Sequence, residues 1–264
     1  MDDYGLHAGS GGEFFMVVVR PGGLALEVKN LGFSYPHGPP VLVDISFSVA
    51  QGETVVVLGP NGAGKSTLCL CLLGIFPARG EVIVFGQQLS RKTARQIRSR
   101  LGLVFQDPND QLFLPQVKDE LAFGPLNQGW PREEIDLKIK EILTRLNLQG
   151  YEDKLISRLS VGEKKKVALA AVLILEPEII ILDEPTAGLD YQSRKNFIHH
   201  LNSLPLTKII ATHDLELAWE LGEKIIILNE GRLVASGSRE KILLNKSLLQ
   251  AHGMNVPLLA RLKD

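Results

Sequence analysis

The chain has 264 residues, of which 45% are hydrophobic, so it is long enough for one large domain with a substantial core, or for a domain with appendages. Its formal net charge of −1 gives no overall electrostatic case for binding nucleic acid. The two cysteines, Cys69 and Cys71, fall two positions apart on a predicted helix and cannot readily pair. This excludes a disulfide framework and favours a reducing compartment, with both thiols acting as small buried apolar groups.

The sequence contains no segment that predicts a membrane-spanning helix. Its longest strictly apolar run, residues 167–175, is well short of the ~20 residues that a bilayer needs. The start of the chain does not resemble a signal peptide, because acidic residues and no lysine or arginine precede the short apolar run at 14–19. Residues 1–23 are rich in glycine, and we interpret them as a flexible leader or a cloning remnant outside the predicted domain.

In chain order, the first predicted elements are strands. Residues 24–28 and 45–49 are separated by a turn rich in proline and glycine at 36–40. A third strand, predicted at 54–58, leads directly into a glycine-rich segment, and residues 67–73 are compatible with a helix. A strand would therefore feed a loop, and a helix N-terminus would direct its dipole at whatever the loop binds.

The glycine-rich segment at 59–67 fits the phosphate-binding pattern G-x-x-x-x-G-K-[ST], with its fixed positions at Gly59, Gly64, Lys65 and Ser66. Glycines allow successive backbone N–H groups to curl around a phosphate. Lys65 supplies a positive charge for terminal phosphates, and Ser66 offers a hydroxyl to Mg²⁺. The alternative, a glycine-rich turn without function, is disfavoured by the flanking strand and helix.

Further along the chain, residues 81–85 and 103–105 predict short strands, and a helix-rich region follows at about 116–175. Within it, residues 132–148 form a strongly amphipathic pattern. The apolar residues that share one face of this predicted helix are Ile135, Ile139, Ile142, Leu143 and Leu146.

The last third of the chain has three runs that are nearly continuous in isoleucine, leucine and valine, at residues 179–182, 208–212 and 224–228. Such runs are typical of parallel strands buried on both faces, and their alternation with helices indicates an α/β core. Residues 232–236 would add an edge strand. Residues 240–262 favour a short helical extension.

Two adjacent carboxylates, Asp183 and Glu184, follow the first of these buried strands. They face different ways because side chains alternate along a strand. Asp183 can reach the Mg²⁺ of a bound nucleotide, and Glu184 can polarise a water for attack on the γ-phosphate. Solvated acids at a strand end are the alternative, and the presence of the phosphate-binding loop favours the catalytic interpretation.

Taken in order, these segments resemble the ABC-type ATPases, the nucleotide-binding subunits of ABC transporters, over roughly residues 24–237. The resemblance implies an α/β P-loop ATPase with a mainly parallel sheet core and an N-terminal antiparallel β subdomain. It also implies a helical subdomain at about 107–175. Residues 238–264 would be a C-terminal helical extension.

The same resemblance implies that ATP and Mg²⁺ are bound. Residues 59–67 look like the Walker A loop, and the residues that would contact nucleotide there are Gly59, Pro60, Asn61, Gly62, Ala63, Gly64, Lys65, Ser66 and Thr67. Residues 179–184 look like the Walker B strand, with Asp183 as a metal ligand beside Ser66. Glu184 would be the catalytic glutamate.

Four further residues are assigned by this resemblance. Gln106 resembles the Q-loop glutamine, with roles in metal binding and catalysis, and His213 resembles the catalytic switch histidine. Asp190 ends a segment similar to the D-loop and would lie at the nucleotide. Tyr35 stands where the family places an aromatic ring that stacks on adenine. The alternatives are a satisfied core or surface histidine, and a turn tyrosine that packs over Pro36.

Residues 159–163, Leu-Ser-Val-Gly-Glu, resemble the family signature Leu-Ser-Gly-Gly-Gln. In the family, the serine and glycine, here Ser160 and Gly162, contact the γ-phosphate held by the other subunit. Val161 adds bulk and removes backbone freedom where the family has glycine. Glu163 adds a negative charge near a phosphate, unless it points at the lysines of residues 164–166. The signature half-site is therefore expected to be weaker than usual.

The three lysines at 164–166 have two interpretations. They could contact a phosphate or a partner, as a basic continuation of the signature helix. They could equally form a solvated helix face. The sequence leaves both open.

Two segments, residues 106–113 and 120–127, resemble the energy-coupling factor (ECF) ATPases and the related cobalt and nickel uptake ATPases. In that family this region lines a groove that grips the coupling helices of an integral membrane partner. The resemblance implies a peripheral subunit at the cytoplasmic face of the cell membrane. It would energise import of a vitamin or a transition metal ion, together with a coupling protein and a substrate-binding membrane protein, and without nucleic acid.

The chain carries one cassette, so the resemblance implies a head-to-tail dimer with two ATP at the interface and a copy or a paralogue as partner. One alternative is a soluble ABC ATPase acting on ribosomes or DNA, but those commonly have two cassettes or a long coiled-coil insertion. A P-loop kinase or GTPase is opposed by the signature, D-loop and histidine resemblances. An ATP-binding regulatory subunit with little turnover is favoured by the altered signature and opposed by Glu184 and His213.

Overall fold

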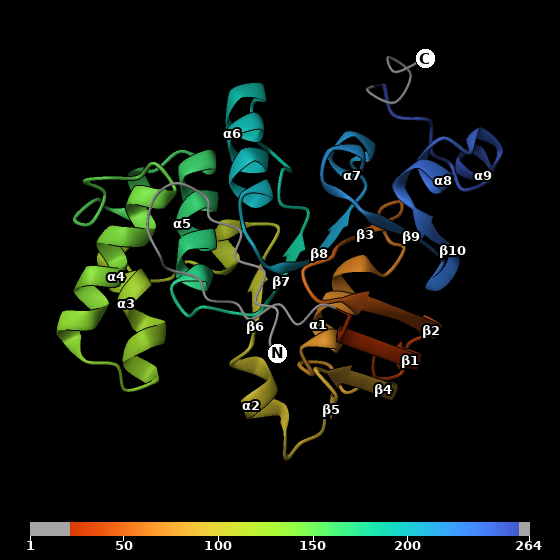
Figure 1. Ribbon diagram of the computed structural model, residues 1–264, viewed down its shortest axis with the longest axis horizontal. Coiled ribbons are helices and arrows are strands. Elements are labelled where there is room, and N and C mark those ends of the chain that lie inside the picture. Colours follow the sequence, from red (N-terminus) through yellow and green to blue (C-terminus); the bar gives the residue numbers. More distant parts are fainter. Residues whose placement is uncertain (1–21, 259–264) are drawn as a thin grey trace, which may run out of the picture.

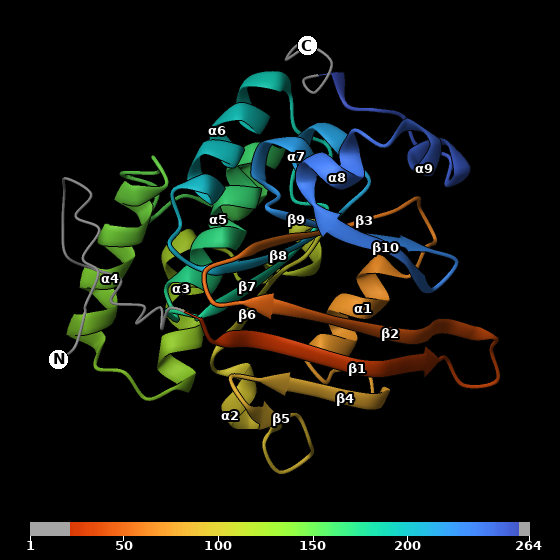
Figure 2. The same ribbon diagram turned by 45° about the vertical axis from the view of Figure 1, so that its right-hand side comes forward.

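The computed structural model describes residues 22–258. It has two β-sheets, with one group of helices at the far end from the smaller sheet (Figures 1 and 2). The expectations for residues 1–21 and 259–264, which cover most of the predicted leader and the end of the predicted extension, lie outside the described residues.

The smaller sheet is antiparallel and has the order β2-β1-β4-β5. Its strands are β1 Leu24–Ser34, β2 Pro40–Ala50, β4 Arg79–Val84 and β5 Gln87–Gln88. The first two are longer than the sequence predicted, because irregularities in register between Val28 and Leu31, and again at Phe33, interrupt the alternation of apolar residues. The predicted strand at 81–85 is also shifted, and it begins at Arg79.

The larger sheet has the order β10-β9-β3-β8-β7-β6 and is parallel except for the edge pair β10 and β9. Its strands are β3 Thr54–Leu58, β6 Leu101–Val104, β7 Ile179–Asp183, β8 Thr207–Thr212, β9 Lys224–Asn229 and β10 Arg232–Ser238. Every residue of β3, β7 and β8 is buried, as the continuous apolar runs predicted. The predicted α/β fold with a parallel core is confirmed.

Helices cover both faces of the larger sheet. They are α1 Lys65–Leu72, α2 Ala94–Arg98, α3 Val117–Asn127, α4 Arg132–Arg145, α5 Val161–Leu173, α6 Tyr191–Asn202, α7 Leu215–Leu221, α8 Arg239–Leu243 and α9 Lys246–Ala251. Helices α3, α4 and α5 gather at one end, whereas α1 lies between the two sheets (Figures 1 and 2). The amphipathic helix predicted at 132–148 is confirmed as α4, although it ends three residues earlier, at Arg145, and the predicted apolar residues are buried.

Alternation along the central strands divides the interior into two clusters. Val56 and Leu58 of β3 pack with helices α3 to α7, whereas Val55 and Val57 pack with α1 and the antiparallel sheet. Cys69 and Cys71 are buried in the second cluster as free thiols, as predicted, and burial raises the pKa of Cys71 to about 12. None of the helices within residues 22–258 is long and apolar enough to cross a membrane.

We expect Phe197→Ala to destabilise the protein by about 3–5 kcal/mol, because Phe197 is fully buried on α6 and its loss leaves a cavity. Urea unfolding monitored by circular dichroism measures the change. Lys195→Ala, on the exposed side of the same helix, is the matched control and should change the free energy of unfolding by less than about 0.5 kcal/mol. Equal effects for the two variants would contradict the assigned core.

Candidate active site

The phosphate-binding pattern forms the turn between β3 and α1, and two of its glycines are required by close contacts. A Cβ added at Gly59 would lie 2.1 Å from the carbonyl oxygen of Leu228 in β9. Gly64 has φ +100°, and a Cβ there would lie 2.9 Å from Leu42. The loop is thus pressed against the sheet and ends at the N-terminus of α1.

Lys65 places its ammonium group inside this loop. Nζ donates hydrogen bonds to the carbonyl oxygens of Gly59, at 2.9 Å, and Pro60, at 3.1 Å. It also lies 3.3 Å from Oε1 of Glu184, and both side chains are only 6% exposed. The loop and the end of β7 are therefore joined by a buried ion pair.

Glu184 is held by the ends of neighbouring strands. Because β7 and β8 are parallel neighbours, their carboxyl ends meet at the same edge of the sheet. Oε2 of Glu184 accepts a hydrogen bond from Oγ1 of Thr212 at 2.8 Å, and Oε1 lies 2.8 Å from Nδ1 of His213. The His213 side chain is 55% exposed, so it forms the outer wall of the cluster.

The backbone of Glu184 adopts an uncommon conformation. Its φ is +42°, in the left-handed region that residues other than glycine rarely occupy. Its N–H donates to the carbonyl oxygen of Ala211 at 2.8 Å, and its own carbonyl oxygen accepts from Nζ of Lys165 at 3.2 Å. Strained backbone that is fixed from both sides is typical of functional positions.

Asp183 is suited to hold a cation. Oδ1 is buried and has no hydrogen-bond partner among the described residues, and the hydroxyl of Ser66 bonds to the same carboxyl group. Burial raises the pKa of Asp183, and the bond from Ser66 opposes this shift. Residues 22–258 contain no group of three or more His, Cys, Asp or Glu side chains that could hold a metal. One carboxylate and one hydroxyl fit Mg²⁺, which takes its other ligands from phosphates and water.

Tyr35 lies at the end of β1 in a cluster of three aromatic rings. Its ring meets Phe33 edge-on, with centroids 5.0 Å apart, and meets Phe76 edge-on at 5.5 Å. Its hydroxyl is 3.4 Å from Oγ1 of Thr67 in α1. The ring is half exposed, so a planar group bound near the phosphate loop could stack on it.

The signature segment forms the N-terminus of α5. Ser160 is the N-cap, and its backbone N–H and hydroxyl donate to Oε2 of Glu163 at 2.7 and 2.8 Å. The other oxygen of Glu163 accepts from the hydroxyl of Tyr151, and this bond is the main reason that the pKa of Glu163 falls to about 2. The alternative in which Glu163 points at the lysines of 164–166 is not what the structure shows, because Ser160 and Tyr151 bond to its two oxygens.

Gly162 packs against the segment that resembles the D-loop. A Cβ at Gly162 would lie 3.0 Å from Oγ of Ser193 in α6. Ser193 is in turn bonded to the carboxylate of Asp190, the N-cap of α6. Close by, Val161 and Tyr191 are exposed. The signature and Asp190 therefore belong to one surface.

The predicted site residues thus fall into two groups. Lys65, Ser66, Asp183, Glu184 and His213 lie together at the edge of the sheet, whereas Ser160, Gly162 and Asp190 form the surface between α5 and α6. No hydrogen bond or ion pair within the described part of the chain joins these two groups. Gln106 is exposed at the end of β6.

The lysines of 164–166 do not form the entirely solvated helix face that was one of the two interpretations drawn from the sequence. Lys164 donates to Oδ1 of Asn109 at 2.8 Å, and Lys166 donates to the carbonyl oxygen of Leu146 at 3.2 Å. Lys165 is fully buried and donates to the carbonyl oxygens of Gln106, at 2.9 Å, and Glu184. Each ammonium therefore has an acceptor within the protein.

Sequence reasoning missed Lys165 as a member of the site. Burial lowers its pKa to about 8, while the nearby carboxylates of Asp107, Glu184 and Asp183 oppose the shift. The helical spacing of the sequence did contain a signal that Lys165 is buried. Lys165 precedes the buried residues Ala168, Leu169 and Val172 by three, four and seven positions, so it falls on the apolar face of α5.

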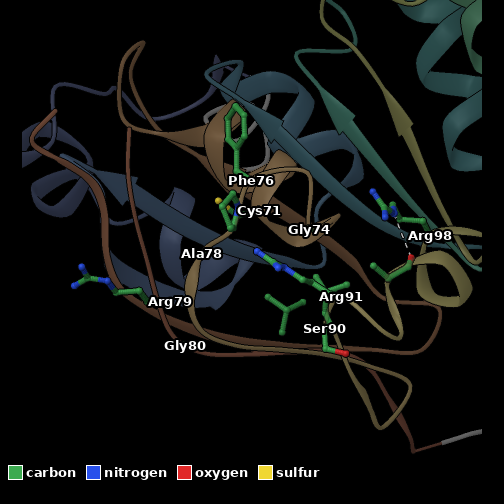
Figure 3. Close-up of a pocket in the computed structure, with 13 residues that line it drawn as sticks. Cys71, Gly74, Phe76, Ala78, Arg79, Gly80, Ser90, Arg91 and Arg98 are labelled. Carbon is green, nitrogen blue, oxygen red and sulfur yellow. Dashed lines mark hydrogen bonds between the residues drawn. The ribbon is translucent and has the colours of Figure 1, made fainter. Parts of the chain in front are cut away.

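A separate cavity of about 380 Å³ lies between the end of α1, β4 and α2 (Figure 3). Cys71, Phe76 and Leu89 are among its apolar lining residues, and Arg79, Arg91 and Arg98 are its charged ones. In the view of Figure 3 the Arg98 side chain turns to the carbonyl oxygen of Ala94, to which it donates at 3.2 Å. The cavity contains none of the predicted site residues.

Comparisons with known proteins agree with this geometry. The family described as ABC transporter matches residues 42–187. A putative ABC transporter ATP-binding protein of Gloeobacter violaceus is 45% identical over 236 residues, which cover 88% of this chain and 97% of that protein. The energy-coupling factor transporter ATP-binding protein EcfA of Methanothermobacter thermautotrophicus is 42% identical over 90% of this chain and 78% of its own length.

Among solved structures, cbiO1 from Clostridium perfringens, part of the ABC transporter complex cbiONQ, superimposes with a TM-score of 0.78. It is 33% identical, and the match covers 91% of this chain and 99% of that one. The residues matched by the family include the phosphate-binding loop, the signature segment and the two carboxylates at the end of β7. The chain therefore belongs to the family of ABC transporter ATPases.

Proposed function

We propose that this chain hydrolyses ATP to energise a membrane importer of the energy-coupling factor type, whose substrate is a vitamin or a transition metal ion. The observation that carries the proposal is the cluster in which the buried phosphate-loop Lys65 meets buried Glu184, with exposed His213 on its outer side. The relatives support the importer, since one is named EcfA and the solved neighbour cbiO1 is part of a transporter complex.

The geometry suggests how ATP would engage the site. The γ-phosphate would compete with Glu184 for the ammonium of Lys65, because both are anions and Lys65 lies within the loop. Release from Lys65 would leave the Glu184 carboxylate, still held by Thr212 and His213, free to polarise the attacking water. His213 is exposed enough to reach the γ-phosphate, and Tyr35 would stack on adenine.

Asp183 and Ser66, with Gln106 at the end of β6, would hold Mg²⁺. The ion, when bound, neutralises charge on the β- and γ-phosphates. The unpartnered Oδ1 of Asp183 and the adjoining Ser66 hydroxyl support this assignment on the protein side.

The separation of the two groups of residues supports a head-to-tail dimer. Ser160, Gly162 and Asp190 would complete the ATP site of a second ABC subunit, which is a copy of this chain or a paralogue. The exposed side chains of Val161 and Tyr191 would be covered at that interface.

A surface beside the Q-loop supports a membrane partner. Phe113 and Phe123 are 62% and 45% exposed, and their rings meet edge-on with centroids 4.9 Å apart. Buried Glu120 fixes the loop that carries Phe113, because Oε2 accepts the backbone N–H groups of Phe113, at 3.0 Å, and Leu114, at 2.7 Å. Exposed aromatic pairs on a rigid support are typical of docking surfaces. An integral membrane coupling protein would bind here, with the chain at the cytoplasmic face.

One observation favours a second candidate, an ATP-binding regulatory subunit with little turnover. The hydroxyl of Ser160 donates to Glu163, so the group that would bind the partner's γ-phosphate already has an acceptor. Glu163 is ionised across the physiological pH range because its pKa is about 2.

We expect Glu184→Gln to retain ATP binding and to lower hydrolysis at least about 100-fold, because the amide cannot take a proton from water. Phosphate release by the transporter complex measures hydrolysis, and a fluorescent ATP analogue measures binding. Glu230→Gln is the matched control, because Glu230 is also an acid at positive φ but is exposed in the turn between β9 and β10. Turnover of the Glu184 variant near that of the wild type would sink the assignment.

We expect Phe113→Ala to reduce the fraction of the chain that sediments with native membranes by about tenfold, in line with loss of an aromatic anchor. Leu137→Ala serves as the control, because Leu137 is equally exposed but lies on α4. Undiminished sedimentation of the Phe113 variant would refute this docking surface, whereas equal losses for both variants would show that the effect is not specific to it.

A further inference from the structure

The loop that follows β6 is bound to α5 at three successive places. Asn109 accepts from Lys164 at 2.8 Å, and the carbonyl oxygen of Gln106 accepts from Lys165 at 2.9 Å. Gln111 donates to the carbonyl oxygen of Ala168 at 2.8 Å and accepts the backbone N–H of Phe105 at 3.2 Å. We call residues 106–111 and α5 together the Q-loop unit, because these bonds would keep them together in any movement.

Lys165 extends from this unit to the catalytic strand. Its ammonium also donates to the carbonyl oxygen of Glu184 at 3.2 Å, and its side chain is only 2% exposed. This one buried ammonium therefore binds two backbone carbonyl groups at the nucleotide-binding edge of the sheet. One follows the end of β6, and the other follows the end of β7.

The two other buried lysines of the described chain, Lys65 and Lys208, do not bond to the loop that follows β6, and neither does half-buried Lys166. Lys208 donates to the carbonyl oxygens of Leu204 and Leu206, both within four residues of it. Lys65 remains within the phosphate loop and the ion pair with Glu184. Lys166, the neighbour of Lys165 on α5, reaches only Leu146 and Asn147. The position of Lys165 is thus specific and is not a general way of burying lysine in this fold.

The hydrogen bond from Lys165 holds a residue whose backbone is in an uncommon conformation. Glu184 has φ +42°, and its N–H is fixed by Ala211, so its carbonyl oxygen is the other backbone group that sets the direction of its side chain. The carbonyl oxygen of Glu184 also accepts the backbone N–H of Ala187 at 3.1 Å. Loss of Lys165 would remove the charged one of its two donors and leave the peptide free to turn toward the remaining bond. A small rotation there would move the Glu184 carboxylate relative to Lys65, Thr212 and His213.

We propose that Lys165 is a positioning residue that couples the Q-loop unit to Glu184, so that docking of the membrane partner beside the Q-loop sets the orientation of the catalytic carboxylate. The inference rests on the proposed function, because it assumes that Glu184 acts on ATP and that a partner docks near Phe113. It assigns to Lys165 no contact with nucleotide.

The test uses the complete complex, purified through a tag on this chain from native membranes in mild detergent, as wild type, Lys165→Met and Lys165→Arg. Methionine keeps the length and loses the donor, whereas arginine keeps a charged donor that can reach carbonyl groups. We expect Lys165→Met to lower kcat for ATP hydrolysis about tenfold or more and to leave KM for ATP within about twofold, because small misplacement of a catalytic group costs rate. Lys165→Arg should recover most of kcat.

Lys166→Met is the matched control on the same helix, and it should leave both constants unchanged. If Lys165→Met fails to fold, Lys165→Gln is the substitute. Its amide donor is shorter and uncharged and cannot bridge both carbonyl groups, so it should show the same loss in kcat at unchanged KM. The proposal is overturned if folded Lys165→Met or Lys165→Gln keeps wild-type kcat, if only KM changes, or if Lys166→Met loses as much kcat. An inactive wild-type complex would instead contradict the proposed function, so the two failures are distinguishable.

Discussion

The geometry of the candidate active site depends on one buried contact, the ion pair between Lys65 and Glu184. The two residues are far apart in sequence, and they meet because β3, β8 and β7 are adjacent parallel strands whose carboxyl ends share one edge. A buried ion pair is a weak source of stability, because the cost of desolvating both charges offsets their attraction. The presence of this ion pair is therefore better explained by a role in function than by a contribution to stability. It holds the phosphate-loop cation and the proposed catalytic carboxylate within reach of each other before ATP binds.

The neighbouring side chains complete the site around this ion pair. Thr212 and His213 belong to the end of β8 and fix the other side of Glu184, while Asp183 keeps one oxygen without a partner. Glu184 bonds to Lys65, Thr212 and His213 within the site. Binding of ATP would exchange these internal partners for phosphate, which links nucleotide state to the position of Glu184, and through Lys165 to the Q-loop unit.

The sequence predicted the elements whose signals are local. The phosphate loop has a fixed pattern of residue types, and the continuous apolar runs identified the parallel strands and hence the edge where their ends meet. It did not predict the full length of β1 and β2, because register irregularities interrupt their alternation. The internal hydrogen bonds of Glu163 and Lys165 were not predicted either. Their partners, Tyr151, Gln106 and Glu184, lie on other elements, so only the folded chain reveals that these charges are internal.

The central claim is that this ATPase works on a membrane importer, and purification of the tagged chain from native membranes in mild detergent, followed by mass spectrometry, tests it most directly. The account predicts recovery of an integral membrane coupling protein together with a small substrate-binding membrane protein. A second ABC subunit in the sample would identify a heterodimer, and its absence would indicate a homodimer. Recovery of ribosomal or DNA-bound proteins, without a membrane protein, would contradict the account.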